Sequence, residues 1–85
     1  MRDTDIIAAA RAEALFASDL PTDHTPSRAN VDQAIRQALR HHHGVRGCAA
    51  EMAYLYGDRP ESAAHRMRWA LGVIGAVYAQ SRSRS

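Results

Sequence analysis

The sequence predicts an all-α fold, namely a compact domain of four helices with a helix-turn-helix-like pair (helices three and four) and a long C-terminal helix. Alanine supplies 17 of the 85 residues and β-branched residues are few, a composition that favours helices over strands. Apolar residues recur at steps of three and four along four segments, which is the period of a helix buried on one face. Residues 1–80 are therefore expected to form a single helical domain.

The first helix is expected to run from Asp3 or Thr4, either of which can cap it, to about Ser18. Its predicted core stripe consists of Ile6, Ile7, Ala10, Ala14 and Ala17. Residues 19–27 contain two prolines and several short polar side chains, so they are predicted to form a loop. Phe16 lies off the stripe and is expected to anchor that loop.

The second helix has the clearest periodicity in the chain. Thr25 or Ser27 is expected to cap it, and Gly44, which can adopt a left-handed conformation, is expected to end it. The predicted buried stripe is Val31, Ala34, Ile35, Ala38, Leu39 and His42. A column at steps of four occupies the other side and consists of Arg28, Asp32, Arg36 and Arg40.

The third helix is expected from Val45 to about Tyr56, where Gly57 would end it. Its predicted apolar side consists of Val45, Cys48, Ala49, Met52, Leu55 and Tyr56. Helices two, three and four are expected to form the core, with the first helix packed across them.

The fourth helix is the longest, and it is expected from Asp58 to Gln80. Asp58 and Glu61 have the spacing of a capping box, and Pro60 suits the first helical turn. The predicted core stripe is Ala63, Met67, Ala70, Ile74 and Val77, flanked by Ala64, Leu71 and Tyr78. Residues 81–85 form a Ser/Arg tail that is expected to be disordered.

The fourth helix is apolar nearly all round from Trp69 to Ala79, which predicts that something covers it. The apolar stretch is too short to cross a bilayer, so no membrane partner is expected. Gly72 and Gly75 each cost about 1 kcal/mol relative to alanine, which is easiest to explain if another backbone approaches there. The predicted interface consists of Trp69, Gly72, Val73 and Ala76, and either the first helix or a second copy of the chain would cover it.

Charge and cysteine content narrow the setting of the protein. Cys48 is the only cysteine, which excludes an intramolecular disulfide and fits a reducing cytoplasm. The N-terminus is acidic and lacks a long apolar segment, so no export signal is expected. Residues 1–27 carry two arginines against five acids, whereas residues 28–85 carry nine against four, which permits an anionic partner.

No enzymatic or metal site is expected. His41, His42 and His43 point 100° apart on a helix, so they and Cys48 do not supply the four ligands of a structural zinc site. His42 instead ends the core stripe, and Cys48 among glycine and alanine suits a small core residue. No carboxylate pair, phosphate-binding glycine loop or serine elbow is present, so neither a cofactor nor catalysis is predicted.

A DNA-binding function is the leading hypothesis, because Gly57 followed by an arginine-rich helix resembles the middle of a helix-turn-helix motif. The predicted DNA-binding surface consists of Arg59, Ser62, His65 and Arg66. Asp58 and Glu61 depart from that pattern. The protein would be a regulatory module, and it is expected to be dimeric in the manner of many DNA-binding helical domains. The alternative is a homodimeric protein-interaction adaptor that uses the Trp69 face of the last helix.

Three segments carry a resemblance to a known group of proteins. They read ALFASDL at 14–20, RGCAA at 46–50 and YGDRPESAAHRMRWA at 56–70. They resemble short all-helical hypothetical proteins of actinobacteria, over most of the chain from Ala14 to Ala70. The resemblance implies an actinobacterial source and a cytoplasmic protein, and it implies no particular activity.

Overall fold

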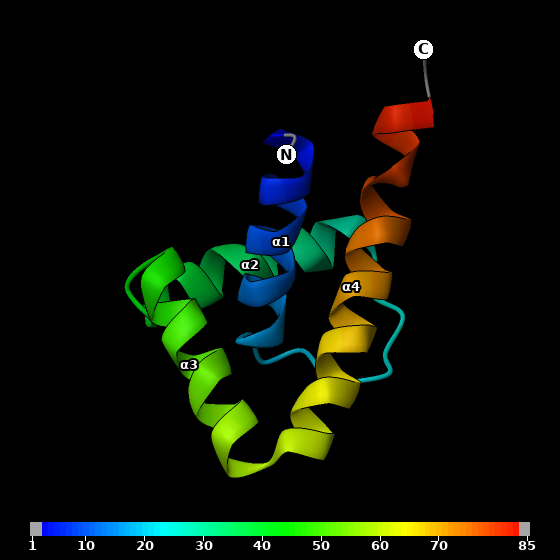
Figure 1. Ribbon diagram of the computed structural model, residues 1–85. Helices are drawn as coiled ribbons and strands as arrows, with labels where there is room; N and C mark the ends of the chain where they lie inside the picture. The colour runs from blue at the N-terminus through cyan, green and yellow to red at the C-terminus, as the bar shows by residue number, and fades with distance from the viewer. Residues whose placement is uncertain (1–2, 84–85) are drawn as a thin grey trace.

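The computed structural model describes the backbone of residues 3–83 and the surroundings of the side chains of residues 6–78. The described residues form four helices and no strand, which confirms the predicted all-α fold (Figure 1). The helices are α1 (Asp3–Phe16), α2 (Arg28–His41), α3 (Val45–Asp58) and α4 (Pro60–Ser83).

The helices are arranged around α1. Helices α3 and α4 form a V, α1 runs down between its two arms, and α2 runs crosswise behind α1 (Figure 1). Helix α1 packs against all three other helices, whereas α2 and α3 share only a small contact. The expectation that helices two, three and four form the core, with the first laid across them, is therefore wrong. Alanine-rich α1 has a thin side-chain layer, which allows several helices to approach it closely.

The core lies at the C-terminal end of α1. Ala12, Leu15 and Phe16 are buried there, while Ile6 and Ile7 on the predicted stripe remain 53% and 47% exposed. The predicted stripe of the first helix is therefore wrong for its first two members. Near Phe16 helices surround α1 on several sides, so burial depends on position along the helix rather than on one face of it.

Helix α2 follows its predicted pattern closely. Ser27 caps it, and its Oγ accepts a hydrogen bond from the backbone N–H of Asn30 at 3.1 Å. Three residues of the predicted stripe are fully buried, namely Val31, Ala34 and Ala38. At the other end His43 adopts a left-handed conformation with φ of 65°, and Gly44 donates to the carbonyl of Leu39 at 2.7 Å. Gly44 also has a positive φ, so the turn uses two such residues where one was expected.

The connection between α3 and α4 is shorter than expected. Helix α3 continues through Gly57 to Asp58, and Arg59 alone separates it from α4. Pro60 explains the position of the break, because proline disfavours the helical conformation of the residue before it and is tolerated in the first turn of a helix. The predicted capping box is therefore wrong, since Asp58 lies in the last turn of α3.

Helix α4 confirms its predicted core stripe. Ala63, Ala70 and Ile74 are buried, and Met67 and Val77 pack against the core. The helix continues to Ser83 rather than ending at Gln80. Residues 84–85 lie outside the described residues, so disorder of the chain end stays a prediction. Within the described part of the chain no helix is long and apolar enough to cross a membrane.

Candidate interaction surface

The side chain of Arg66 turns inward from α4 towards the end of α1. Its Nε donates to the carbonyl of Phe16 at 2.7 Å, and its Nη2 donates to those of Ser18 at 2.8 Å and Leu15 at 3.4 Å. Its Nη1 donates to Thr22 Oγ1 at 2.8 Å. The last carbonyls of a helix lack partners within the helix, so Arg66 supplies donors that α1 needs.

The surroundings of Arg66 also explain its electrostatics. Burial lowers the pKa of the guanidinium, and the negative charge of Asp19 partly offsets this effect. The guanidinium carbon lies 4.9 Å from the centroid of the Trp69 ring. Arg66 is therefore half-buried rather than part of the exposed surface on which the helical spacing placed it.

The other residues of the predicted DNA-binding surface remain exposed. His65 Nε2 lies 3.0 Å from both carboxylate oxygens of Asp23 in the α1–α2 loop. Arg59 is 77% exposed in its side chain, and its Nε lies 3.6 Å from Asp58 Oδ2. Glu61 in the first turn of α4 adds a further negative charge. The start of α4 therefore presents cations and carboxylates in close alternation.

The α1–α2 loop covers part of Trp69. The indole Nε1 donates to the carbonyl of His24 at 2.8 Å, and the ring packs against the core. This contact ties the loop to α4, as the His65–Asp23 pair does one turn earlier. The cover therefore comes from the loop, whereas the sequence predicts α1 or a second copy of the chain in this place. Sequence periodicity could not indicate this cover, because the loop has no helical period.

A groove lies beside Trp69, between α4 and the loop. It has a volume of about 360 Å³, and residues 23–26 line it on the loop side. On the α4 side it is lined by Arg68, Trp69, Gly72, Val73, Ala76 and Val77. The structure thus brings all four residues of the predicted interface together on one concave surface. We name these four, Trp69, Gly72, Val73 and Ala76, the Trp69 face.

Apolar and small residues of α4 are exposed between Leu71 and Ala76. Leu71 is 51% exposed, and Gly72, Gly75 and Ala76 are also exposed. No neighbouring atom of the described chain lies within 4 Å of a Cβ built on Gly72 or Gly75. Packing within the described chain therefore does not account for these two glycines.

The residues considered for metal or thiol chemistry occupy ordinary structural positions. Cys48 is buried, its Sγ lies 3.6 Å from the carbonyl oxygen of Ala38, and burial together with the charge of Glu13 raises the pKa of its thiol. His42 Nε2 lies 3.2 Å from the carbonyl oxygen of Ala17. Among the side chains that the structure describes, no three of His, Cys, Asp or Glu are grouped to hold a metal ion.

Sequence reasoning missed the role of Tyr78 as well as that of the loop. Its hydroxyl donates to Asp32 Oδ1 of α2, and Arg11 of α1 lies over its ring at 3.9 Å from the centroid. The sequence showed Tyr78 only as a flank of an apolar stripe, and it contained no signal for its polar partners.

Comparison with known proteins adds no further assignment. No protein-family model, curated protein or solved structure gives a significant match to this chain.

Proposed function

We propose that the protein is a small non-enzymatic interaction module that forms a homodimer through the Trp69 face of α4. The observation that carries this proposal is that Gly72 of the Trp69 face and Gly75 next to it are exposed, with no neighbouring atom of the described residues within 4 Å of either Cβ position. Each glycine destabilises a helix interior by about 1 kcal/mol relative to alanine. A second helix that packs closely against them would explain why they occur there.

The rest of the Trp69 face is suited to such a contact. Trp69 to Tyr78 includes no charged residue, and the exposed positions there are small or apolar. Gly72 and Ala76 are four residues apart, so they share one side of the helix and allow a neighbouring axis to approach. A two-fold axis would place the same face of each copy against the other, with Trp69 as the large side chain at its edge.

The proposed test measures self-association by sedimentation equilibrium over a wide range of protein concentrations. The wild-type chain should dimerise, and Gly72→Leu should shift it to monomer, because a leucine would occupy the space of the partner helix. Trp69→Ala should weaken the dimer as well. Gly57→Ala provides a matched control, since Gly57 is also a helical glycine with open space around it and lies in α3, away from the Trp69 face.

The outcomes separate the proposal from a monomeric bundle. Circular dichroism should show unchanged helix content in Gly72→Leu, as the open space at that position accommodates a side chain. A wild-type chain that stays monomeric at high concentration would contradict the proposal. Equal association of wild type and Gly72→Leu would contradict it too.

DNA binding through the start of α4 has less support as a second function. Arg66 donates its hydrogen bonds within the molecule, and Asp58 and Glu61 would face the phosphates beside Arg59, Ser62 and His65.

We propose a cytoplasmic location for the module, because a reducing compartment suits its single thiol.

A further inference from the structure

The positive charge of the chain is concentrated in α2, the turn that follows it and the first two residues of α3. Residues 28–46 contain four arginines and one acid, whereas the rest of the chain contains seven arginines and eight acids. The formal excess of positive charge therefore belongs to this segment. Three of these arginines lie on α2 and Arg46 lies at the start of α3, and such a concentration attracts polyanions through its local field.

The single acid of this segment is engaged on the flank of α2. Asp32 Oδ1 accepts a hydrogen bond from the hydroxyl of Tyr78, and Asp32 Oδ2 lies 4.0 Å from Arg28 Nε. The carboxylate is thus turned towards α4 and a neighbouring cation. Although Asp32 lies one turn before Arg36 in the predicted column, its carboxylate contacts Tyr78 and Arg28 rather than Arg36.

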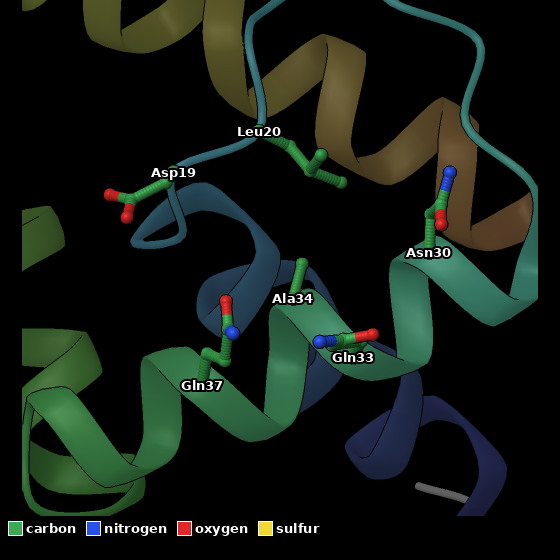
Figure 2. A pocket seen from close by; sticks show the side chains of 6 residues that line it. All are labelled: Asp19, Leu20, Asn30, Gln33, Ala34 and Gln37. Carbon is green, nitrogen blue, oxygen red and sulfur yellow. The ribbon is translucent and has the colours of Figure 1, made fainter.

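The side of α2 opposite the core carries four exposed polar residues, which we name the α2 outer face: Gln33, Arg36, Gln37 and Arg40. They recur at i, i+3, i+4 and i+7, so they lie on one side of the helix over about two turns. The buried residues Val31, Ala34 and Ala38 lie on the other side. Figure 2 shows Gln33 and Gln37 projecting from successive turns of α2.

We propose that the α2 outer face binds double-stranded DNA with α2 in the major groove. Arginine side chains bind phosphates and guanine edges, and glutamine amides form paired hydrogen bonds with adenine edges. An α-helix is about 10–12 Å across with its side chains, which matches the roughly 12 Å width of that groove, and the 14 residues of α2 give it a length of about 21 Å. This function goes beyond dimerisation and uses a different helix from the Trp69 face.

One carboxylate lies near the α2 outer face. Asp19 lines the same surface hollows as Gln37, and Figure 2 shows its side chain pointing away from that residue. The negative charge of Asp19 also acts on Arg66, whose pKa it raises against the larger lowering by burial. Asp19→Asn should therefore strengthen DNA binding slightly or leave it unchanged.

The test measures fluorescence anisotropy of a labelled DNA duplex of mixed sequence at several salt concentrations. Arg36→Ala/Arg40→Ala should weaken binding at least about ten-fold and reduce the slope of log K against log salt by about 2, since each phosphate contact contributes roughly 0.9. The matched control is Arg59→Ala/Arg68→Ala, which removes the same charge from exposed positions at the α3–α4 connection and in α4 and should have little effect. Alanine favours helix at both α2 positions, and circular dichroism would check the fold. Arg36→Gln/Arg40→Gln removes the same charge should the alanine pair prove unstable.

Base recognition has its own readout. Gln33→Ala/Gln37→Ala should preserve the salt slope and reduce the preference for particular sequences selected from a random duplex pool. The proposal fails if wild type does not bind the duplex at low salt, if the Arg59→Ala/Arg68→Ala control weakens binding as much as the α2 pair, or if single-stranded DNA, duplex RNA, heparin or an acidic polypeptide binds equally well. If Gly72→Leu is monomeric and still binds DNA through α2, DNA binding does not require the dimer. That outcome supports the α2 proposal independently of the proposed homodimer.

Discussion

Arg66 donates four hydrogen bonds to the end of α1 and to the loop that follows it. Three of the acceptors are backbone carbonyls, and that of Leu15 also accepts from the N–H of Ser18 at 3.1 Å and from Ser18 Oγ at 2.6 Å. The spacing of Arg66 along α4 places it next to His65 and Trp69, on a side that we expected to be exposed. The α1–α2 loop folds back over that side, so the side chain of Arg66 connects α4 to α1 and to the loop.

A substitution at this residue tests its structural role. Arg66→Ala should lower the free energy of unfolding by about 2 kcal/mol, because hydrogen bonds from a charged donor are lost, with part of the loss offset by water at this half-buried position. Arg68→Ala removes a nearby exposed arginine and should change it by less than about 0.5 kcal/mol. Urea denaturation of both variants measures the difference, and equal effects would show that Arg66 does not cap α1.

At the scale of elements, the start of α2 depends on one hydroxyl. The sequence offered Thr25 and Ser27 as caps, and the structure assigns the cap to Ser27, whose Oγ accepts from Asn30 N–H at 3.1 Å. Ser27→Ala should therefore destabilise the protein by about 1 kcal/mol. Thr25→Ala should have an effect smaller than about 0.5 kcal/mol, as Thr25 is exposed outside the helix. Thermal unfolding compares the two, and a larger loss in Thr25→Ala would contradict the assignment.

The boundary between α3 and α4 is set by Pro60 rather than by Gly57. Pro60 sets the break between α3 and α4 at Arg59, because the residue before a proline avoids the helical conformation. Gly57, three residues before Pro60, was expected to end α3 and instead lies within it. Glycine permits a left-handed turn without requiring one, whereas the proline ring excludes the helix at the preceding residue.

At the scale of the whole molecule, Tyr78 connects three helices. Its hydroxyl donates to Asp32 of α2, and Arg11 of α1 and Arg28 of α2 lie 3.9 Å and 4.8 Å from its ring centroid. Burial raises the pKa of Tyr78 most, the hydrogen bond and charge of Asp32 raise it further, and the two arginines oppose these effects. A raised pKa means that the fold favours the protonated phenol.

The raised pKa of Tyr78 predicts how the free energy of unfolding changes with pH. The stabilisation from Tyr78 should be complete below its unfolded pKa of about 10 and should be lost as the pH rises through the higher pKa of the folded protein. Tyr78→Phe keeps the ring, should lower the free energy of unfolding by about 1 kcal/mol at neutral pH, and should flatten the alkaline decline. Tyr54→Phe serves as the control because Tyr54 is 65% exposed. An alkaline decline that is identical in Tyr78→Phe and wild type would contradict the assignment.

Helical periodicity predicted which residues of α4 share one side, but not which element lies opposite them. It grouped Trp69, Gly72, Val73 and Ala76 correctly, because residues three and four apart share a side of one helix. It could not identify what lies opposite them, since the α1–α2 loop has no period. For the same reason it placed Arg66 on an exposed surface, although the loop supplies Thr22 Oγ1 and the carbonyl of Ser18 as its acceptors.

The sequence by itself determined the helical class, the number of helices and the buried sides of α2 and α4, because these depend on propensity and on contacts between residues a few positions apart. Only the tertiary structure decided that α1 is central, that Ile6 and Ile7 stay exposed, and that Arg66 and Tyr78 connect distant elements. These features depend on contacts between residues far apart in the chain. The periodicity of one helix does not indicate which other element its side chains will contact.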